Sequence, residues 1–536
     1  MPWFWALLVA LLCPVSSLGA EAPDHTPSPQ RGGTLRLALP NDLRSLDPAI
    51  GYEPESWCIM RLMFRGLLDY GQGLDLVPWQ CREWSISPDG RTFSFHLRDD
   101  ARFASGRPVE AADYVRSLER VLRPSTLSPG EGFFRGIAGA KEFQAGTAAG
   151  VRGLRAPSSD RLEIELERPD LSFPYLLAMP FAFAVPHEAL TPGGAGFIGL
   201  PTGSGPYALE EWQRGVRLKF RRKALRAGDT GGYPDAIVLS IGGDETLHQM
   251  MFERGELDLV LSPNGIPIPD FPRVLRDPRL QPMIHQMPEG ATFYVAMNTE
   301  LPPFDRPLVR RAMNHAVDTR RLVRLLNGRA TPARGVLPPG MPGFDPALPG
   351  YDYNPEQARA LLAQAGLPDG FQTTLWMTAN DQRDSRLGEA LQEDLARVGI
   401  RIELKPVTMA TFLDGVTRRR NAPCALSRWY QDFPDPSNFL DTLLNGQRIV
   451  DENCNNRAFY RNPEVDRLLD AASGSAHPEE RLALYRRVER QVVADAPWVF
   501  LLHPQLYALR QPWVRGPGLH PIWPYRLDQL WLERAP

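Results

Sequence analysis

The feature that most constrains the fold of this chain is the alternation of strand-like and helix-like segments along most of its length. Residues 33–39, 91–98 and 161–167 alternate apolar and polar side chains with period two. This pattern is typical of strands that bury one face and expose the other. A chain of 536 residues is long enough for two to four structural units. We therefore expect several sheets and not one small core.

Helical patterns lie between these strands. The apolar side chains of residues 109–122 recur at helical spacing and are Val109, Ala112, Val115 and Leu118. Later segments beginning at residues 354, 462 and 477 each place Pro at the first helical position and an acidic residue in the first turn. The sequence therefore predicts a mixed α/β protein.

The N-terminus has the pattern of an export signal. Residues 1–20 hold an apolar core followed by small residues, and residues 21–30 form a polar, proline-rich leader of the flexible kind. No later stretch reaches the ~18 apolar residues that a membrane span needs. Cys13 suggests a lipid anchor as an alternative, but the residue before it is the bulky Leu12. We expect an exported protein, in the periplasm or at the outer face of the cytoplasmic membrane.

Charge and cysteine content narrow the class of partner and of site. A net charge of −3 does not favour nucleic acid. Apart from Cys13 the cysteines are an even set of four, so disulfides are plausible in an oxidising compartment, and the expected pairs are Cys58 with Cys81 and Cys424 with Cys454. Buried free thiols are the alternative. No cysteine pair has zinc spacing and the histidines are scattered, so we expect no metal site.

Signatures of common enzymes are absent from the sequence. It contains no HExxH, no phosphate-binding loop ending in GK[ST] and no GxSxG. Residues 194–199 satisfy GxGxxG, but neither a strand pattern precedes them nor a helix pattern follows. Asp432 and Asp435 could act as paired carboxylates, although an Asp-Pro sequence at 435 is more typical of a turn, where the side chain bonds the following backbone. We expect no enzymatic activity and no cofactor.

Several motifs occur in an order that resembles one known family, the family 5 extracellular solute-binding proteins, which include the oligopeptide and dipeptide receptors of ABC importers. The strongest likeness is residues 84–122, in which Ser105 stands where the family more often has Asp. The other similar segments are "RGGTLRLALPNDLRSLDPA" (31–49), "GSGPYALEEW" (203–212), "GELDLV" (255–260) and "NTELPPFDRPLVRRAMNHAVDTRRLV" (298–323). The likeness runs from about residue 31 to about residue 530.

This resemblance implies a two-lobed periplasmic-binding-protein fold (type II, cluster C) with an extra domain and a central ligand cleft. The first lobe would be discontinuous and the lobes would be joined by a two-strand hinge. The expected ranges are residues 31–52, 179–283 and 501–536 for lobe I, 53–178 for the extra domain and 284–500 for lobe II.

The resemblance also points to the segment "RWYQDFPDPSNFL" (428–440) as part of the cleft. It implies that Asp432 accepts the terminal ammonium of a peptide, with Trp429 offering side-chain surface and Tyr430 pairing backbone. A carboxylate in a closed cleft attracts a cation more strongly than a surface carboxylate does.

Further contacts follow from the same resemblance. Gly51 to Glu53, including Tyr52, would form the edge of the cleft in the first lobe, and Phe133 or Phe134 would close one wall. Leu426 stands where some relatives place an arginine for the ligand carboxylate. The candidate replacements, since guanidinium binds carboxylate bidentately, are Arg383, Arg418 and Arg428.

The leading functional hypothesis is therefore a monomeric receptor that captures short peptides by hinge closure and delivers them to an ABC importer, a membrane permease with a cytoplasmic ATPase. Three alternatives stay open. The same fold could bind a nickel complex, haem, glutathione or a sugar. The chain could be a secreted hydrolase that uses Asp432 and Asp435, or a surface adhesion or sensor protein.

Overall fold

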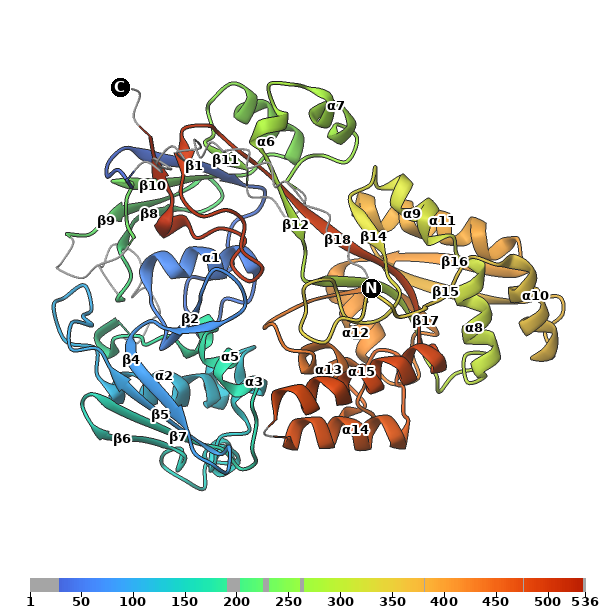
Figure 1. The fold of residues 1–536 in the computed structure, drawn as a ribbon, viewed down its shortest axis with the longest axis horizontal. Coiled ribbons are helices and arrows are strands. Elements are labelled where there is room, and N and C mark those ends of the chain that lie inside the picture. Colours follow the sequence, from blue (N-terminus) through green and yellow to red (C-terminus); the bar gives the residue numbers. More distant parts are fainter. Residues whose placement is uncertain are drawn as a thin grey trace, which may run out of the picture.

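The computed structural model describes residues 28–189, 203–224, 231–260, 265–379, 381–475 and 477–533. The expected signal peptide, Cys13, most of the leader and the GxGxxG segment lie outside these residues. The described chain forms two lobes, and strands β12 (Ile284–Pro288) and β18 (Trp498–Arg510) run side by side between them (Figure 1). The two strands pair antiparallel, from Ile284 opposite Leu509 to Pro288 opposite Gln505. They form a two-stranded connection between the lobes.

The first lobe is built on a sheet of four strands whose order joins distant parts of the chain. Its strands are, in spatial order, β1 (Thr34–Leu39), β10 (Ala236–Ile241), β9 (Arg217–Arg222) and β8 (Tyr207–Gln213). β1 and β10 are parallel and the other two pairs are antiparallel. Leu35, Leu37 and Leu39 are buried. The period-two strand predicted at 33–39 is confirmed.

The second lobe is built on a larger, mixed sheet. Its strand order is β11 (Leu259–Val260), β18, β13 (Ala291–Met297), β17 (Cys424–Tyr430), β15 (Phe371–Thr378) and β16 (Ile400–Val407), with β12 and β14 (Ala330–Pro332) also pairing with β18. β13 is buried at every position because the sheet is covered on both sides. β18 belongs to both lobes: its last residues pair with β11, and residues 498–502 pair with β13.

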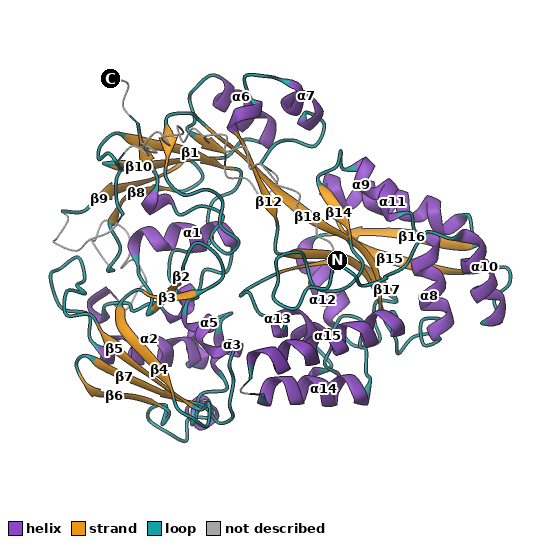
Figure 2. Cartoon of the chain, in the orientation of Figure 1, coloured by secondary structure: helices purple, strands orange, loops and turns teal. Residues whose placement is uncertain are grey.

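A small antiparallel sheet lies below the sheet of β1, β8, β9 and β10 in the view of Figure 2. Its strands are β4 (Cys81–Ile86), β5 (Thr92–Leu97), β7 (Arg161–Glu165) and β6 (Leu154–Ser158). Two short strand pairs complete the sheets: β2 (Leu68–Tyr70) with β3 (Leu76–Pro78), and β19 (Val514–Arg515) with β20 (Trp531–Leu532). Leu37 of the first-lobe sheet and Phe95 of the small sheet belong to one continuous cluster of buried apolar side chains.

The helices divide between the lobes in chain order. Those that accompany the first lobe and the small sheet are α1 (Pro54–Met63), α2 (Ala111–Leu122), α3 (Glu131–Phe134), α4 (Ala140–Gln144), α5 (Phe173–Leu177), α6 (Glu245–Glu253) and α7 (Phe271–Arg276). Those of the second lobe are α8 (Pro307–Ala316), α9 (Thr319–Leu325), α10 (Pro355–Gln364), α11 (Gln382–Ala396), α12 (Met409–Thr417), α13 (Ser437–Leu444), α14 (Pro463–Gly474) and α15 (Pro478–Asp495). The three predicted Pro-initiated helices are confirmed as α10, α14 and α15.

The apolar face predicted for residues 109–122 is partly wrong. Helix α2 begins at Ala111, so Val109 precedes it, and Ala112 and Val115 are only half-buried. The buried face contains Leu118, as predicted, and also Ala111, Tyr114, Val121 and Leu122. The spacing of apolar residues alone does not distinguish two possible buried faces of a helix that are offset by one residue, which is about 100° around the helix axis.

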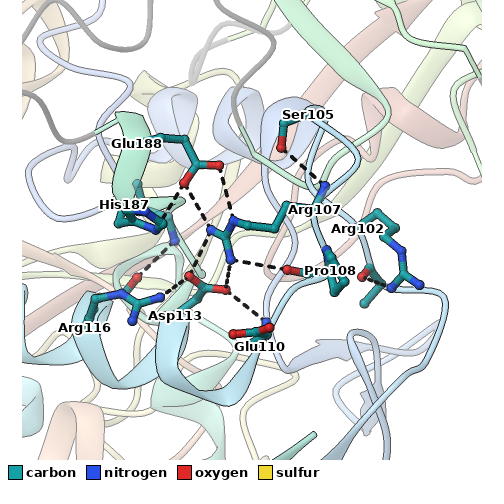
Figure 3. A network of polar contacts seen from close by, with 12 residues as sticks. Arg102, Ser105, Arg107, Pro108, Glu110, Asp113, Arg116, His187 and Glu188 are labelled. Atoms are coloured by element: carbon teal, nitrogen blue, oxygen red, sulfur yellow. Dashed lines mark hydrogen bonds and ion pairs between the residues drawn. The ribbon is translucent and has the colours of Figure 1, made fainter. Parts of the chain in front are cut away.

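A polar network ties the start of α2 to residues 187–189 (Figure 3). The Arg107 guanidinium donates to both Asp113, at 2.9 Å and 3.1 Å, and Glu188, at 3.3 Å and 3.2 Å. Asp113 is buried, and its carboxylate also accepts from the backbone N–H of Glu110 at 2.9 Å. This network closes the N-terminus of α2 and links it to residues 187–189.

The expected disulfides are not formed. Cys58, Cys81, Cys424 and Cys454 are all buried free thiols. Three of the thiols contact backbone carbonyls: Cys81 lies 3.2 Å from Leu67 O, Cys424 lies 3.3 Å from Thr374 O and Cys454 lies 3.7 Å from Asn456 O. Spacing along the chain suggested local pairs, but the fold places each thiol in its own packed surroundings.

None of the described helices is long and apolar enough to serve as a bilayer span.

Candidate ligand-binding site

A cavity of about 480 Å³ lies between the lobes. It is lined by Leu39, Asn41, Pro54, Glu55, Cys58, Ile59 and Pro524 from β1 and just after it, α1 and the C-terminal segment, by Glu289, Asp381, Arg383, Arg428 and Tyr430 from the second lobe, and by Leu506 from β18. This volume is in the range of small-molecule sites, which are concave and carry a few convergent polar groups on an apolar lining.

Asp432 lies where the two lobes touch. Its Oδ1 accepts a 2.7 Å hydrogen bond from the Tyr52 hydroxyl, and its Oδ2 accepts one of 3.0 Å from Asn438 Nδ2. Both donors are neutral, and in the described part of the chain no cationic side chain pairs with this carboxylate. Burial raises the pKa of Asp432, while the bonds from Asn438 and Tyr52 act in the opposite direction. A carboxylate in such a position favours an additional cation.

Asn438 organises the segment around Asp432. Its Oδ1 accepts from the Trp429 indole N–H at 3.1 Å and from the backbone N–H of Asp432 at 3.0 Å. The same amide therefore fixes both Trp429 and the Asp432 carboxylate. Nothing in the sequence pattern singled out Asn438, because its role depends on how the loop folds back onto α13.

Three contacts hold the cleft closed. The Tyr52–Asp432 bond is one, and Gln431 Nε2 donates to Pro521 O at 2.9 Å. The third is between the rings of Phe133 and Phe433, whose centroids are 6.4 Å apart. Phe433 comes from the second-lobe segment but is buried in the apolar cluster of the first lobe. The structure is therefore the closed form.

Tyr52 and Glu53, which were predicted to form the first-lobe edge of the cleft, lie where the two lobes touch. The Tyr52 ring packs against Trp57, Phe133 and Phe181 with centroids 5.6 Å, 6.3 Å and 5.6 Å away. Glu53 is the residue before α1 and accepts from Ser56 Oγ at 2.9 Å. Phe133 is half-buried, whereas Phe134 is fully buried in the core.

The three candidate arginines fall in different surroundings. Arg428 lines the cavity but already pairs with Asp381 at 3.2 Å and with Asp384 at 2.7 Å. Arg383 also lines the cavity, and its guanidinium lies over the Phe293 ring at 5.0 Å from the centroid. Arg418 is exposed, pairs with Asp414 at 3.0 Å and lines a separate surface hollow.

Tyr430 lines the cavity at the end of β17. β17 pairs with β13 along its whole length, from Cys424 opposite Met297 to Tyr430 opposite Ala291. On its other side it pairs with β15 only at Cys424 and Ala425. Among the described residues, the part of β17 that reaches the cavity therefore has a strand neighbour on one side only.

Asp435 does not form a catalytic pair with Asp432. Its carboxylate makes a bidentate ion pair with Arg481, at 2.6 Å and 2.7 Å, and both side chains are buried. Asp435 Oδ1 also accepts from the backbone N–H of Ser437 at 2.9 Å, as predicted for a turn-forming Asp-Pro. Asp435 is therefore paired with Arg481 and not with Asp432.

Three acids that line the cavity, Glu55, Glu289 and Asp381, were not anticipated from the sequence. Glu55 is in the first turn of α1, and Glu289 is in the tight connection between β12 and β13. Acidic residues are common in the first turn of a helix, where the helix dipole favours them, and beside a glycine in a tight turn. Their positions in the sequence therefore did not indicate a ligand cavity. Only the tertiary structure shows that all three face the same cavity.

Comparison with known proteins agrees with this architecture. Residues 75–451 match the family described as bacterial extracellular solute-binding proteins, family 5. Heme-binding protein A of Haemophilus influenzae is 30% identical over 95% of this chain and 94% of its own length. Probable di/tripeptide-binding protein 5 of Pseudomonas aeruginosa is 29% identical over 85% of this chain and 86% of its own length.

A solved structure extends the agreement to three dimensions. Clavulanic acid biosynthesis oligopeptide binding protein 2 superposes with a TM-score of 0.87 and 29% identity, over 95% of this chain and 97% of the other. The family match covers more than half of the sequence, and the superposition covers both lobes. This chain belongs to the bacterial extracellular solute-binding proteins of family 5.

Proposed function

We propose that this protein is an extracytoplasmic receptor that encloses short peptides between its lobes and delivers them to an ABC importer without altering them. The observation that carries the proposal is the Asp432 carboxylate, which lies at the lobe contact and which, among the described residues, is bonded by the neutral groups of Tyr52 and Asn438 and by no cation. The terminal ammonium of a peptide supplies the cation that this carboxylate lacks.

Strand β17 supports a peptide ligand. The edge of β17 beyond Ala425 has no strand partner on the β15 side in the described residues. An extended peptide can pair with such an edge through its backbone, which gives affinity without reading the peptide sequence. The names of two relatives, a di/tripeptide-binding and an oligopeptide-binding protein, agree with this ligand class.

Haem, suggested by the name of the Haemophilus relative, is supported less well. No histidine is among the described residues that line the cavity, and the one cysteine there, Cys58, has a pKa raised to about 12 by burial. A thiol that stays protonated is a poor iron ligand.

The proposal also covers the location of the protein, its transport partner, its lobe boundaries and its oligomeric state. The apolar N-terminal segment supports export to the periplasm, and family membership supports a permease with a cytoplasmic ATPase as partner. We also propose the lobe boundaries at residues 31–52, 179–283 and 501–536 for lobe I, 53–178 for the extra domain and 284–500 for lobe II. We also propose that the protein acts as a monomer.

The decisive experiment compares free and N-acetylated peptide pools. Ligand-stripped protein is heated with di- to pentapeptide pools, and a ligand that binds only the native state raises the melting temperature by mass action. Free pools should stabilise the protein and acetylated pools should not. Stabilisation by neither pool contradicts the peptide assignment.

The variant Asp432→Asn tests the ammonium site directly. It should weaken binding of free-amine peptides by about 100-fold, because charge-assisted hydrogen bonds contribute about 1.5–3 kcal/mol and the carboxylate is shielded from water. The matched control is Asp352→Asn, since the Asp352 side chain is 84% exposed. Unchanged affinity in Asp432→Asn contradicts the proposed role.

A further inference from the structure

A short segment of the second lobe, residues 431–433, reaches across to the first lobe. It follows β17 and precedes α13. The polar contacts of Gln431 and Asp432 described above join it to the first lobe. Phe433 adds an apolar contact: it is only 6% exposed, and it is buried in the apolar cluster of the first lobe and not in one of its own lobe. We call residues 431–433 the inter-lobe strap.

Phe433 packs beside a group of four aromatic rings in the first lobe. Each of these rings lies within 6.3 Å of at least two of the others, centroid to centroid, and they are Tyr52, Trp57, Phe133 and Phe181. The Phe133 ring meets the Phe433 ring edge-on, with their planes at 81°. In Figure 1, α3, which carries Phe133, faces α13, which follows the strap. We call the four rings the aromatic socket.

The strap is fixed to its own lobe, so it moves with that lobe. Asn438 binds both the backbone N–H and the carboxylate of Asp432, and the Gln431 N–H donates to Gly290 O at 2.7 Å. Gly290 leaves room for the strap, because a Cβ there would lie 2.2 Å from the Gln431 side chain. When the lobes separate, a strap held in this way withdraws Phe433 from the socket.

The contacts of the strap with the first lobe need no ligand. They join residues of the chain itself, so they form whether or not a peptide lies in the cavity. Tyr52 is 39% exposed, so its bond to Asp432 competes with water, whereas the Phe433 ring is removed from water. Among the strap contacts, the burial of Phe433 therefore favours the closed form most.

We propose that Phe433 and the aromatic socket form an apolar latch that holds the receptor closed in the absence of ligand and gates entry to the cleft. Residues of both lobes line the cavity, so a peptide enters only after the lobes separate and Phe433 leaves the socket. The gate rests on the proposed function, whereas the latch itself does not. Asp432 is the neighbour of Phe433, so ammonium binding and latching act on one rigid segment.

X-ray scattering of ligand-stripped protein tests the latch alone. Phe433→Ala removes the ring of the strap, and Phe133→Ala removes its contact from the socket. Each should raise the radius of gyration above that of the unaltered protein. The double variant should raise it no further than the larger single effect, because both changes remove the same contact. Circular dichroism checks that the variants fold, and the half-buried Phe133 provides the test if Phe433→Ala does not fold.

The matched control is Phe371→Ala. Phe371 is half-buried at the start of β15 and packs against Phe304 of the same lobe, with centroids 5.8 Å apart. Its removal should leave the radius of gyration unchanged. An unchanged radius in the folded Phe433 and Phe133 variants overturns the latch. An unaltered protein that is already as open as these variants also overturns it.

Stopped-flow mixing tests the gate, with a free tripeptide drawn from a pool that raises the melting temperature. In Phe433→Ala the association rate constant should rise at least about threefold and the dissociation rate constant at least about tenfold, because the closed form neither admits nor releases a peptide. Unchanged or slower association in this variant overturns the gate. Failure of every free-amine peptide to bind overturns the proposed function, and the scattering result still decides the latch.

Discussion

The Tyr52 hydroxyl donates a 2.7 Å hydrogen bond to Asp432 Oδ1 and so joins two residues that are 380 positions apart in the chain. Tyr52 belongs to the segment before α1, and Asp432 follows β17 of the second lobe. The bond therefore crosses the cleft. It couples the residue proposed to bind the ligand ammonium to the closure of the two lobes.

Removing this hydroxyl should favour the open form. In Tyr52→Phe the ring contacts with Trp57 and Phe181 can persist, but Asp432 loses one of its two donors. A hydrogen bond to a charged group contributes about 1.5–3 kcal/mol, so we expect the ligand-free protein to open and peptide affinity to fall about 10- to 100-fold. Small-angle scattering and calorimetry measure the two effects. An unchanged radius of gyration would contradict the coupling.

The buried Arg481–Asp435 pair should be essential for stability. Arg481→Met leaves the Asp435 carboxylate buried without its cation, which costs about 3–5 kcal/mol of unfolding free energy in chemical denaturation. Adding Asp435→Asn should recover much of this loss. Arg467→Met is the control, since Arg467 and Glu464 form an exposed pair worth less than about 1 kcal/mol. A loss below about 1 kcal/mol in Arg481→Met would refute the expectation.

Glu489 should make stability fall as the pH rises from about 4.5 to about 7. Burial raises the pKa of Glu489 to about 7, although the N–H groups of Val336 and Leu337 donate to it at 2.8 Å. The folded state then binds more protons than the unfolded state in this window, which is worth about 3 kcal/mol in total. Glu489→Gln keeps an oxygen acceptor and cannot titrate, so its stability curve should be flatter.

The control for this pH dependence is Asp277→Asn. The side-chain hydrogen bond from Arg279 lowers the pKa of Asp277 to about 2, so this group does not titrate between about pH 5 and about pH 7, where most of the Glu489 effect falls. Its removal should leave the slope in that window unchanged. Thermal melts across the window measure all three proteins, and equal slopes for Glu489→Gln and the unaltered protein would contradict the assignment.

The four described thiols should be inert in the native protein. Burial raises the pKa of Cys58, Cys81 and Cys424 to about 12, 11 and 12. In protein that lacks residues 1–20, a thiol reagent should label none of them at pH 8 and all four after unfolding without reductant. Fewer than four after unfolding would indicate a disulfide.

Local chemistry made much of the fold predictable. Asn354 and Asn462 precede Pro-initiated helices and cap them with their own side chains, as short-range geometry requires. The strand at 33–39 follows from its period-two pattern in the same way. Two predictions were wrong: the buried face of α2 and the pairing of the cysteines. Both depend on which residues are neighbours in space, and neighbours in sequence do not reveal this.

The α/β class, the three Pro-initiated helices and the likeness to the solute-binding family could be predicted from the sequence, and the interest in the segment around Asp432 followed from that likeness. Periodicity and capping act within a few tens of residues, and the order of motifs can be followed along the chain without knowing which segments meet in space. Three relationships are visible in the fold alone: Asp432 meets Tyr52, Asp435 pairs with Arg481, and Glu55 and Glu289 line one cavity. Such pairings depend on how β12 and β18 bring the two lobes together, and this long-range closure leaves no local pattern in the chain.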